Sequence, residues 1–173
     1  MELCQLDKLY VHSLVQYNRV LLQRNRLLKE LAFKPEYETT LDIWDEQLVK
    51  YGVEVITSRR LFIEQLGGII SGIHARLSGG KEEISVLYDP DIREEDFKAA
   101  LEKNRSQDIR QKTTLAGPTD DINFIVNGID IRRFGSQGQQ RTAALSLKLS
   151  ELELVKLVSR DAPVLLLDDV LSE

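Results

Sequence analysis

The 173-residue sequence lacks the features that mark secreted and membrane-spanning proteins. Its single cysteine, Cys4, cannot form an internal disulfide, which is typical of a protein in a reducing compartment. No apolar run approaches the roughly 20 residues that cross a bilayer. The first residues form neither a basic start nor an apolar stretch of signal-peptide length. We therefore expect a cytoplasmic protein with no membrane partner.

Histidines are also few, and the chain as a whole is not basic. The 2 histidines, His12 and His74, have no metal-ligand partners at suitable spacing, so both are predicted to be ordinary packing or surface residues. The formal net charge of −5 argues against a uniformly basic nucleic-acid binder. Residues 1–34 nevertheless hold six basic and three acidic side chains, a local charge of +3. With 42% hydrophobic residues, the chain is able to bury a core.

Apolar residues recur at helical spacing through the first half of the chain. Residues 6–31 contain no glycine or proline and predict one long amphipathic helix, which Pro35 ends. A near-heptad apolar stripe over residues 41–77 predicts a second long helix, beginning at residue 39 or 40. The Gly67-Gly68 pair inside it predicts a kink or a close helix contact. Two long helices joined by a short turn favour an antiparallel hairpin.

A strand and a third helix are expected before residue 112. Gly79-Gly80 ends the second helix, and residues 83–88 then predict a short strand. The third helix covers residues 93–110, and its acidic first turn suits the positive end of a helix dipole. Residues 1–112 are therefore predicted to form a mainly helical domain.

Beyond residue 113 the pattern changes to strand, turn, strand, helix and strand. Asn127-Gly128 separates two β-rich runs, 122–126 and 129–131, and supplies the positive φ values that a type I′ turn requires. A helix is expected over residues 137–159, and the continuous apolar run at 163–167 is typical of a buried strand. Together with the helical first part, this second domain, residues 113–173, predicts an α+β fold that is mostly α.

Two groups of residues in this second domain are suited to nucleotide chemistry. Asp168 and Asp169 end the last strand, as do the acids that hold Mg²⁺ and adjoin the attacking water in nucleotide-hydrolysing α/β folds. Two solvated acids are the alternative. Ser136 precedes the expected helix between two glycines, where its hydroxyl, nearby backbone amides and the helix dipole can face a phosphate. A simple helix N-cap is the alternative for this serine.

Three stretches of the sequence resemble one protein family. The strings FGSQGQQRTAALSLKLSELELVK and APVLLLDDVLSE resemble the signature motif and the Walker B strand of the RecF family. Members of that family are bacterial recombination and repair ATPases related to ABC and SMC proteins. The string VHSLVQYNRVLLQRNRLLKEL is similar to the family's helical domain, which is inserted between two parts of an ATPase head. The resemblance thus spans nearly the whole chain.

The resemblance implies a role for each matching residue. The signature motif, which in the family reaches ATP held by the other subunit of a dimer, comprises Ser136, Gln137, Gly138 and Gln139. Ser136 and Gly138 are the implied phosphate contacts. Asp168 is the implied Mg²⁺ ligand, and Asp169 stands where related ATPases carry a catalytic acid.

For a complete protein, the resemblance implies a weak DNA-dependent ATPase. It also implies an ATP-dependent homodimer that binds single- and double-stranded DNA at gaps or junctions and helps to load recombinase. Other recombination mediators of the same pathway are the implied partners. A role in DNA replication, DNA damage repair and the SOS response follows from the same resemblance.

The chain departs from the family pattern in three ways. It contains no G-x-x-x-x-G-K-[ST] phosphate loop, so we expect it neither to hold ATP tightly nor to hydrolyse it alone. The segment 117–121, Gly-Pro-Thr-Asp-Asp, is shorter than the family's Gly-Pro-His-Arg-Asp-Asp, and no site is assigned there. The chain also stops within the motif that follows the Walker B strand. We therefore expect it to be a fragment of a longer ATPase.

Basic side chains form two further candidate surfaces. Those on the first expected helix either meet DNA phosphates or solvate a helix face: Arg19, Arg24, Arg26 and Lys29. Those near the signature motif are better candidates for an interface or a phosphate environment: Arg132, Arg133, Arg141 and Lys148. Two other hypotheses remain open, a non-enzymatic helical interaction module and the head of another SMC-like ATPase.

Overall fold

The computed structural model describes residues 3–159, which divide into two compact units. We call residues 3–62 and 88–122 the hairpin unit, and residues 63–87 and 123–159 the sheet unit. The units interleave along the chain, whereas the sequence places one domain boundary near residue 112; that boundary remains a prediction. Within residues 3–159, no helix is both long enough and apolar enough to cross a membrane.

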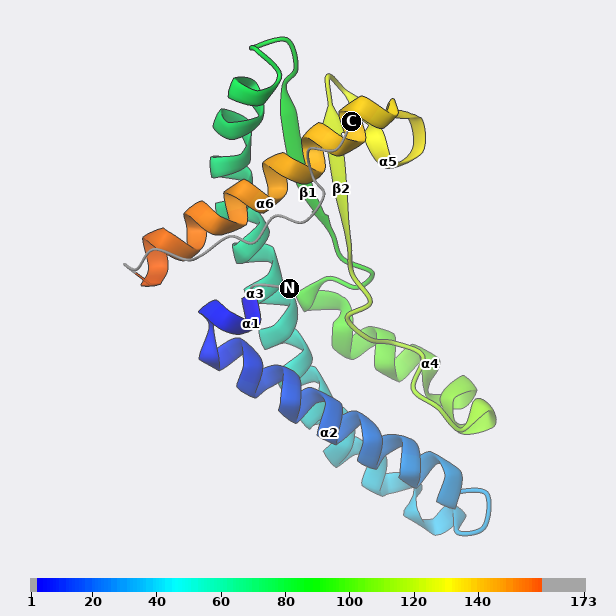
Figure 1. Cartoon of the computed structure of the whole chain (residues 1–173). Coiled ribbons are helices and arrows are strands. Elements are labelled where there is room, and N and C mark those ends of the chain that lie inside the picture. The colour runs from blue at the N-terminus through cyan, green and yellow to red at the C-terminus, as the bar shows by residue number, and fades with distance from the viewer. Residues whose placement is uncertain (1–2, 160–173) are drawn as a thin grey trace. The chain divides into compact units, whose positions relative to one another are not determined.

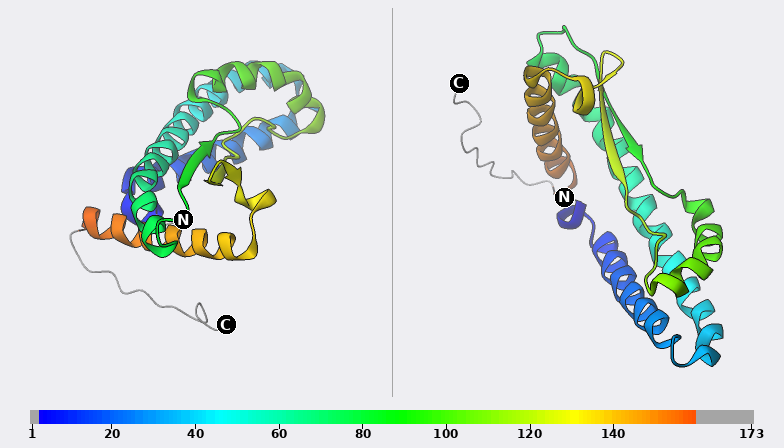
Figure 2. Two further views of the ribbon diagram at one scale, coloured as in Figure 1. Left: turned by 90° about the horizontal axis from the view of Figure 1, so that it is seen from above. Right: turned by 90° about the vertical axis from the view of Figure 1, so that its right-hand side faces the viewer.

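Helices make up most of the hairpin unit. Its elements are α1 (Leu3–Leu6), α2 (Lys8–Glu30), the 3₁₀ helix η1 (Pro35–Thr40), the first part of α3 (Leu41–Leu77), the 3₁₀ helix η2 (Glu94–Asp96) and α4 (Phe97–Gln111). The views agree that α2 and the first part of α3 run side by side as the expected antiparallel hairpin (Figure 1, Figure 2). The predicted fold class, a mostly α member of the α+β class, is confirmed.

The ends of α2 differ from the sequence prediction. Its first residues form the separate helix α1, because the Asp7 carboxylate accepts hydrogen bonds from the backbone N–H groups of Leu9 and Tyr10 and starts α2 there. The helix ends at Glu30, before Pro35, and the proline begins η1 instead. Pro35 therefore opens the connecting turn and does not itself end α2.

The buried face of α2 follows the expected periodicity, with one charged exception. Tyr10, Tyr17, Val20, Leu27 and Leu28 are buried, and Leu14 and Leu21 lie at the margins of this face. Leu27, Leu28 and Leu31 pack with Leu41 at the start of α3, and Trp44 and Ile109 cover this cluster. The exception is Arg24, whose side chain is completely buried in the same face.

Helix α3 runs without interruption past Gly67 and Gly68. Among the described residues, a Cβ atom at Gly68 would meet nothing within 4 Å, and one at Gly67 would meet only the Val86 carbonyl oxygen, at 3.9 Å. The predicted close helix contact is therefore not found at this pair among residues 3–159, and the predicted kink stays a prediction. The glycine of α3 that permits a close contact is Gly52, where a Cβ atom would lie 2.0 Å from the ring of Phe97 at the start of α4.

The sheet unit combines the end of α3 with most of a small sheet and two helices. The strands β1 (Ile84–Asp89), β2 (Asp121–Val126) and β3 (Ile129–Asp130) lie in that order in the sheet. β2 and β3 are antiparallel, in the register Val126 opposite Ile129. Asn127 and Gly128 have φ values of 49° and 80°, as the type I′ prediction requires.

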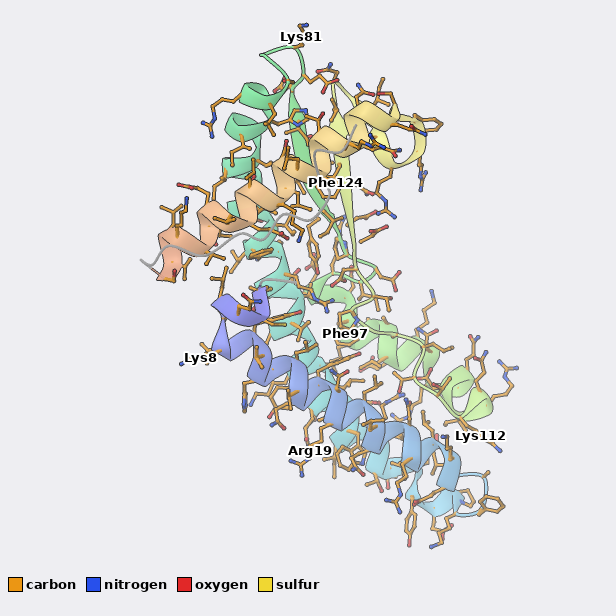
Figure 3. The ribbon with its side chains drawn as sticks, in the orientation of Figure 1. Lys8, Arg19, Lys81, Phe97, Lys112 and Phe124 are labelled. Atoms are coloured by element: carbon orange, nitrogen blue, oxygen red, sulfur yellow. The ribbon has the colours of Figure 1, made fainter. Side chains whose placement is uncertain are left out.

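Two helices complete the sheet unit, α5 (Ile131–Phe134) and α6 (Gln137–Ser159). β3 is shorter than predicted, because the Asp130 carboxylate accepts a hydrogen bond from the Arg132 N–H and starts α5. The core of the unit joins α3, the sheet, α5 and α6 through Ile70, Ile84, Val126, Ile131 and Ala143. Phe124, labelled in Figure 3, packs against this cluster from β2. α6 covers the residues that the sequence predicts.

Candidate functional site

The loop between α5 and α6 carries the predicted signature residues. Ser136 lies just before α6, and its Oγ accepts a hydrogen bond from the Gln139 N–H at 3.2 Å. In return, the Gln139 side-chain Oε1 accepts from the Ser136 N–H at 3.0 Å. These two bonds form a capping box, which satisfies two otherwise free donors at the start of the helix. Sequence reasoning anticipated the serine cap but missed its glutamine partner, although the S-x-x-Q spacing carried that signal.

Some backbone donors at this helix start have no partner among the described residues. The Gln140 N–H donates to the Ser136 carbonyl oxygen at 3.0 Å, whereas no partner among residues 3–159 is found for the N–H groups of Gln137 and Gly138. Ser136, Gln137 and Gly138 are all exposed. The Ser136 hydroxyl only accepts in the capping box, so its own proton remains available to donate. With the positive end of a 23-residue helix behind them, these groups suit an anion.

The two glycines of the loop differ in the space available for a side chain. A Cβ atom on Gly135 would lie 2.6 Å from the Ile131 carbonyl oxygen and 2.7 Å from the Ile131 Cβ, so α5 requires glycine there. A Cβ atom on Gly138 would meet only the Ser136 Oγ, at 3.9 Å. Gly138 lies in the first turn of a helix, where glycine is disfavoured by up to about 1 kcal/mol relative to alanine. The described part of the chain therefore gives no packing reason for Gly138.

Other side chains hold the loop in place. The Gln140 amide nitrogen donates to the Ile131 carbonyl oxygen at 2.8 Å, which ties α6 to α5. The Gln139 amide nitrogen donates to the Glu82 carboxylate at 3.0 Å. Glu82 lies between α3 and β1, near Lys81, which Figure 3 labels. No sequence motif pointed to Glu82, because it is 57 residues from its partner.

The basic residues near the loop lie mostly at the surface. The side chains of Arg132, Arg133, Arg141 and Lys148 are exposed. Arg133 lies 3.5 Å from the Asp130 carboxylate, and Lys148 lies 2.8 Å from that of Glu151. Arg132 lines a pocket of about 370 Å³ together with apolar residues that include Phe124 and Leu147. Arg132, Arg133 and Arg141 lie within five residues of the start of α6, whereas Lys148 lies further along the helix.

The basic residues of α2 do not act as one group. Arg24 is buried, and its guanidinium contacts Asp45 at 2.6 Å and Asp108 at 2.7 Å. Arg24 therefore cannot meet DNA phosphates, which corrects its inclusion among the candidates. Arg19, Arg26 and Lys29 are exposed, and Arg26 also forms a pair with Glu30 at 3.2 Å.

The shortened segment at residues 117–121 is held by the hairpin unit. The Arg59 guanidinium donates to the Pro118 carbonyl oxygen at 2.8 Å and to Asp120 at 2.6 Å. Burial by itself lowers the pKa of Arg59, but hydrogen bonds with Tyr10 and Asp120 outweigh it and raise the pKa. Burial also raises the pKa of Tyr17 to about 12. These groups keep their ordinary charge near neutral pH, which is consistent with a structural cluster.

The predicted acidic site is not tested by the described structure. Asp168 and Asp169 lie outside the described residues. Within residues 3–159, no group of three or more His, Cys, Asp or Glu side chains is arranged to hold a metal ion. The buried His74 lies 2.8 Å from the Ser146 hydroxyl through Nδ1, so the prediction of a packing role suits it.

Known proteins are similar to this sequence along its whole length. No family model matches the chain. Over 100% of the chain, it is 60% identical to the "DNA replication and repair protein RecF" of Lachnospira eligens and 52% identical to that of Lachnoclostridium phytofermentans. The chain belongs to the RecF family. It spans about half the length of these curated relatives, 48% in each case.

Solved structures of RecF share the fold as well. The chain matches a structure described as the recombination mediator protein RecF-ATPrS in the RecFOR pathway, with a TM-score of 0.86 and 38% identity. That match covers 97% of the chain and 48% of the solved one. A second structure, described as RecF-ATP in the same pathway, matches with the same TM-score over 95% of the chain.

Proposed function

We propose that this chain is the part of a RecF ATPase that presents the signature loop, Ser136–Gln139, to ATP bound by a second copy of the protein. The observation that carries the proposal is the exposed start of α6. The Ser136 hydroxyl proton and the N–H groups of Gln137 and Gly138 all belong to this first turn, and the capping box leaves them without a partner among residues 3–159. ATP offers the matching chemistry, because the oxygen atoms of its γ-phosphate accept hydrogen bonds and carry negative charge.

Gly138 supports the same proposal from a different direction. Residues 3–159 neither require a glycine at this position nor fill the space beside it. A glycine permits close approach of a ligand to the backbone. We infer that the open space beside Gly138 receives the phosphate, at a modest cost in helix stability. The solved RecF-ATP and RecF-ATPrS structures agree with a nucleotide as the ligand of a complete RecF protein.

The remaining roles rest on the family resemblance. We propose that Asp168 holds Mg²⁺ with the nucleotide and that Asp169 is the catalytic acid. In the complete protein, ATP-dependent dimerisation on DNA at gaps or junctions helps to load recombinase, together with other mediators of the pathway. Of the four basic candidates named on α2, the exposed Arg19, Arg26 and Lys29 remain candidates for DNA phosphates.

The test is Ser136→Arg in a full-length protein that contains this chain. A long cation at the loop displaces the hydroxyl and fills the phosphate position of the partner. Light scattering with and without ATP is expected to show loss of ATP-dependent dimerisation. Equilibrium binding of ATP to the monomer is expected to stay close to that of the wild type.

Ser106→Arg is the matched control, because Ser106 is an exposed serine on α4 and receives the same added charge. This variant is expected to dimerise as the wild type does. Unchanged ATP-dependent dimerisation of Ser136→Arg would sink the proposal. If the wild type associates equally with and without nucleotide, the helical interaction module is favoured instead.

A further inference from the structure

Glu82 lies one hydrogen bond away from the signature serine's capping box. Its Oε1 accepts from the Gln139 Nε2 at 3.0 Å, while the Gln139 Oε1 accepts from the Ser136 N–H at 3.0 Å. This orientation of the Gln139 amide is the one that fits both neighbours, since a carboxylate only accepts and a backbone N–H only donates. Both ends of the Gln139 amide are thereby engaged, one toward Ser136 and one toward Glu82.

The backbone around Glu82 is fixed on both sides. The Glu82 N–H donates to the Ser78 hydroxyl at 3.4 Å. The next residue, Glu83, donates its N–H to the Asn127 side chain at 2.9 Å and accepts from the Asn127 N–H at 2.9 Å. The Glu82 side chain is only 21% exposed. These bonds fix the backbone that carries the Glu82 carboxylate, the acceptor of the Gln139 amide.

A buried histidine lies beside the other oxygen of Glu82. The Nε2 of His74 lies 3.3 Å from the Glu82 Oε2 without forming a hydrogen bond among the described residues, and the His74 side chain is completely buried. The His74 Nδ1 lies 2.8 Å from the Ser146 hydroxyl, which donates to the Thr142 carbonyl oxygen at 2.7 Å. These contacts place the imidazole between α6 and Glu82. The loop is therefore connected to the core of the sheet unit through side chains.

We propose that Glu82 is a positioning residue for the signature loop. It holds Gln139, and Gln139 in turn holds the backbone and hydroxyl of Ser136 in the geometry that meets a phosphate. Glu82 itself does not touch ATP, and the effect of Gln139 on ATP passes through Ser136. This inference rests on the proposed function of Ser136, but its structural step is measurable without any nucleotide. Hydrogen bonds to a charged acceptor are stronger than neutral ones, which gives the carboxylate its particular value.

The structural step is tested on the 173-residue chain by NMR. Glu82→Ala removes the acceptor of the Gln139 amide, whereas Glu82→Gln keeps an oxygen there. We expect Glu82→Ala to move the Gln139 side-chain amide resonances and to speed exchange of the Ser136 N–H roughly threefold to tenfold, as for the loss of one supporting hydrogen bond. Glu82→Gln is expected to restore most of the wild-type values.

Glu83→Ala is the matched control, because Glu83 is the adjacent acid, its side chain is exposed and only its backbone takes part. A double substitution adds a second check. Because Glu82 acts through Gln139, Gln139→Ala and Glu82→Ala together are expected to change Ser136 exchange little more than Gln139→Ala alone. Wild-type exchange in Glu82→Ala, equal changes in Glu83→Ala, or additive effects of the pair would each overturn the inference.

The functional step is tested in the full-length protein. Glu82→Ala is expected to raise the ATP concentration for half-maximal dimerisation roughly threefold to tenfold, by the same reasoning, with ATP binding by the monomer unchanged. If Ser136→Arg leaves dimerisation intact, the proposed function fails, whatever Glu82 does to exchange. If Ser136→Arg abolishes dimerisation but Glu82→Ala leaves both readouts unchanged, the positioning role alone fails.

Discussion

Separate replacement of Gly135 and Gly138 by alanine tests whether each glycine is needed for folding or for phosphate binding. The two glycines lie three residues apart, and each would gain the same methyl group. At Gly135 the new Cβ would come within 2.8 Å of three Ile131 atoms, two of them in the backbone. At Gly138 the new Cβ would meet only the Ser136 Oγ among the described residues, at an ordinary 3.9 Å, when its chain neighbours and its own helix backbone are left aside.

These distances predict opposite effects on stability. The contacts at Gly135 lie below 3.0 Å, so α5 or the loop must shift. Overpacking of this kind costs about 1–3 kcal/mol, which lowers the Tm by about 3–9 °C at roughly 3 °C per kcal/mol for a chain of this size. Gly138 has no positive φ. Alanine is better in a helix by up to about 1 kcal/mol, so the Tm is expected to stay or to rise by up to about 3 °C.

The same pair is then measured for function. Thermal unfolding of the 173-residue chain, followed by circular dichroism, gives the Tm values. Light scattering of the full-length proteins gives ATP-dependent dimerisation. Gly138→Ala is expected to be at least as stable as the wild type and yet to lose ATP-dependent dimerisation, because the methyl group occupies the space assigned to the phosphate.

Two results would refute this reasoning. A Tm loss in Gly138→Ala as large as that in Gly135→Ala would mean that the fold itself requires the second glycine. A stable Gly138→Ala protein that dimerises at wild-type ATP concentrations would mean that no phosphate approaches this part of the loop.

Two further predictions concern the hairpin unit. Arg24→Ala leaves the carboxylates of Asp45 and Asp108 without their cation and is expected to cost about 3–5 kcal/mol in urea unfolding. Arg26→Ala, at a 75% exposed side chain, is expected to change stability by roughly 0.5 kcal/mol or less; equal effects would contradict the reading of the buried cluster. Burial raises the pKa of Tyr17 from 10.0 to about 12, so its contribution to the free energy of unfolding is complete below pH 10 and is lost as the pH rises through 12. Between pH 10 and 12 the free energy of unfolding of Tyr17→Phe is expected to fall by up to about 2–3 kcal/mol less than that of the wild type. Identical dependence of the urea midpoint on pH in the two proteins would exclude this role for Tyr17.

Local patterns predicted most of the helices and the hairpin turn. Apolar spacing located α3 closely, because an apolar stripe at helical spacing marks the buried face of a helix. The Gly-Ser-Gln-Gly loop located the start of α6. Asn127-Gly128 fixed its turn through backbone conformation alone. The burial of Arg24 was not predictable in this way. Its partners lie 21 and 84 residues away, and a charged residue on an amphipathic helix is ordinarily assigned to solvent.

In the candidate site, too, local features were predictable and long-range contacts were not. The serine cap and the family resemblance were visible in Ser136–Gln139, because the residues of a capping box lie within four positions of one another. The support from Glu82 was not visible, since it depends on a contact across 57 residues. The different constraints on Gly135 and Gly138 were also hidden, because they arise from the three-dimensional neighbours of each Cβ position.

The buried cluster around Arg24 has a mechanical consequence for the helical hairpin. An apolar seam between helices tolerates a slide of one turn, about 5.4 Å, because leucines replace one another with little loss. Such a slide of α2 along α3 would instead separate Arg24 from Asp45 and Asp108 and leave buried charges unpaired. The hairpin is thus locked in one register. A force applied along α2 would be transmitted as a rigid displacement of the helix pair, and not absorbed by slippage between the two helices.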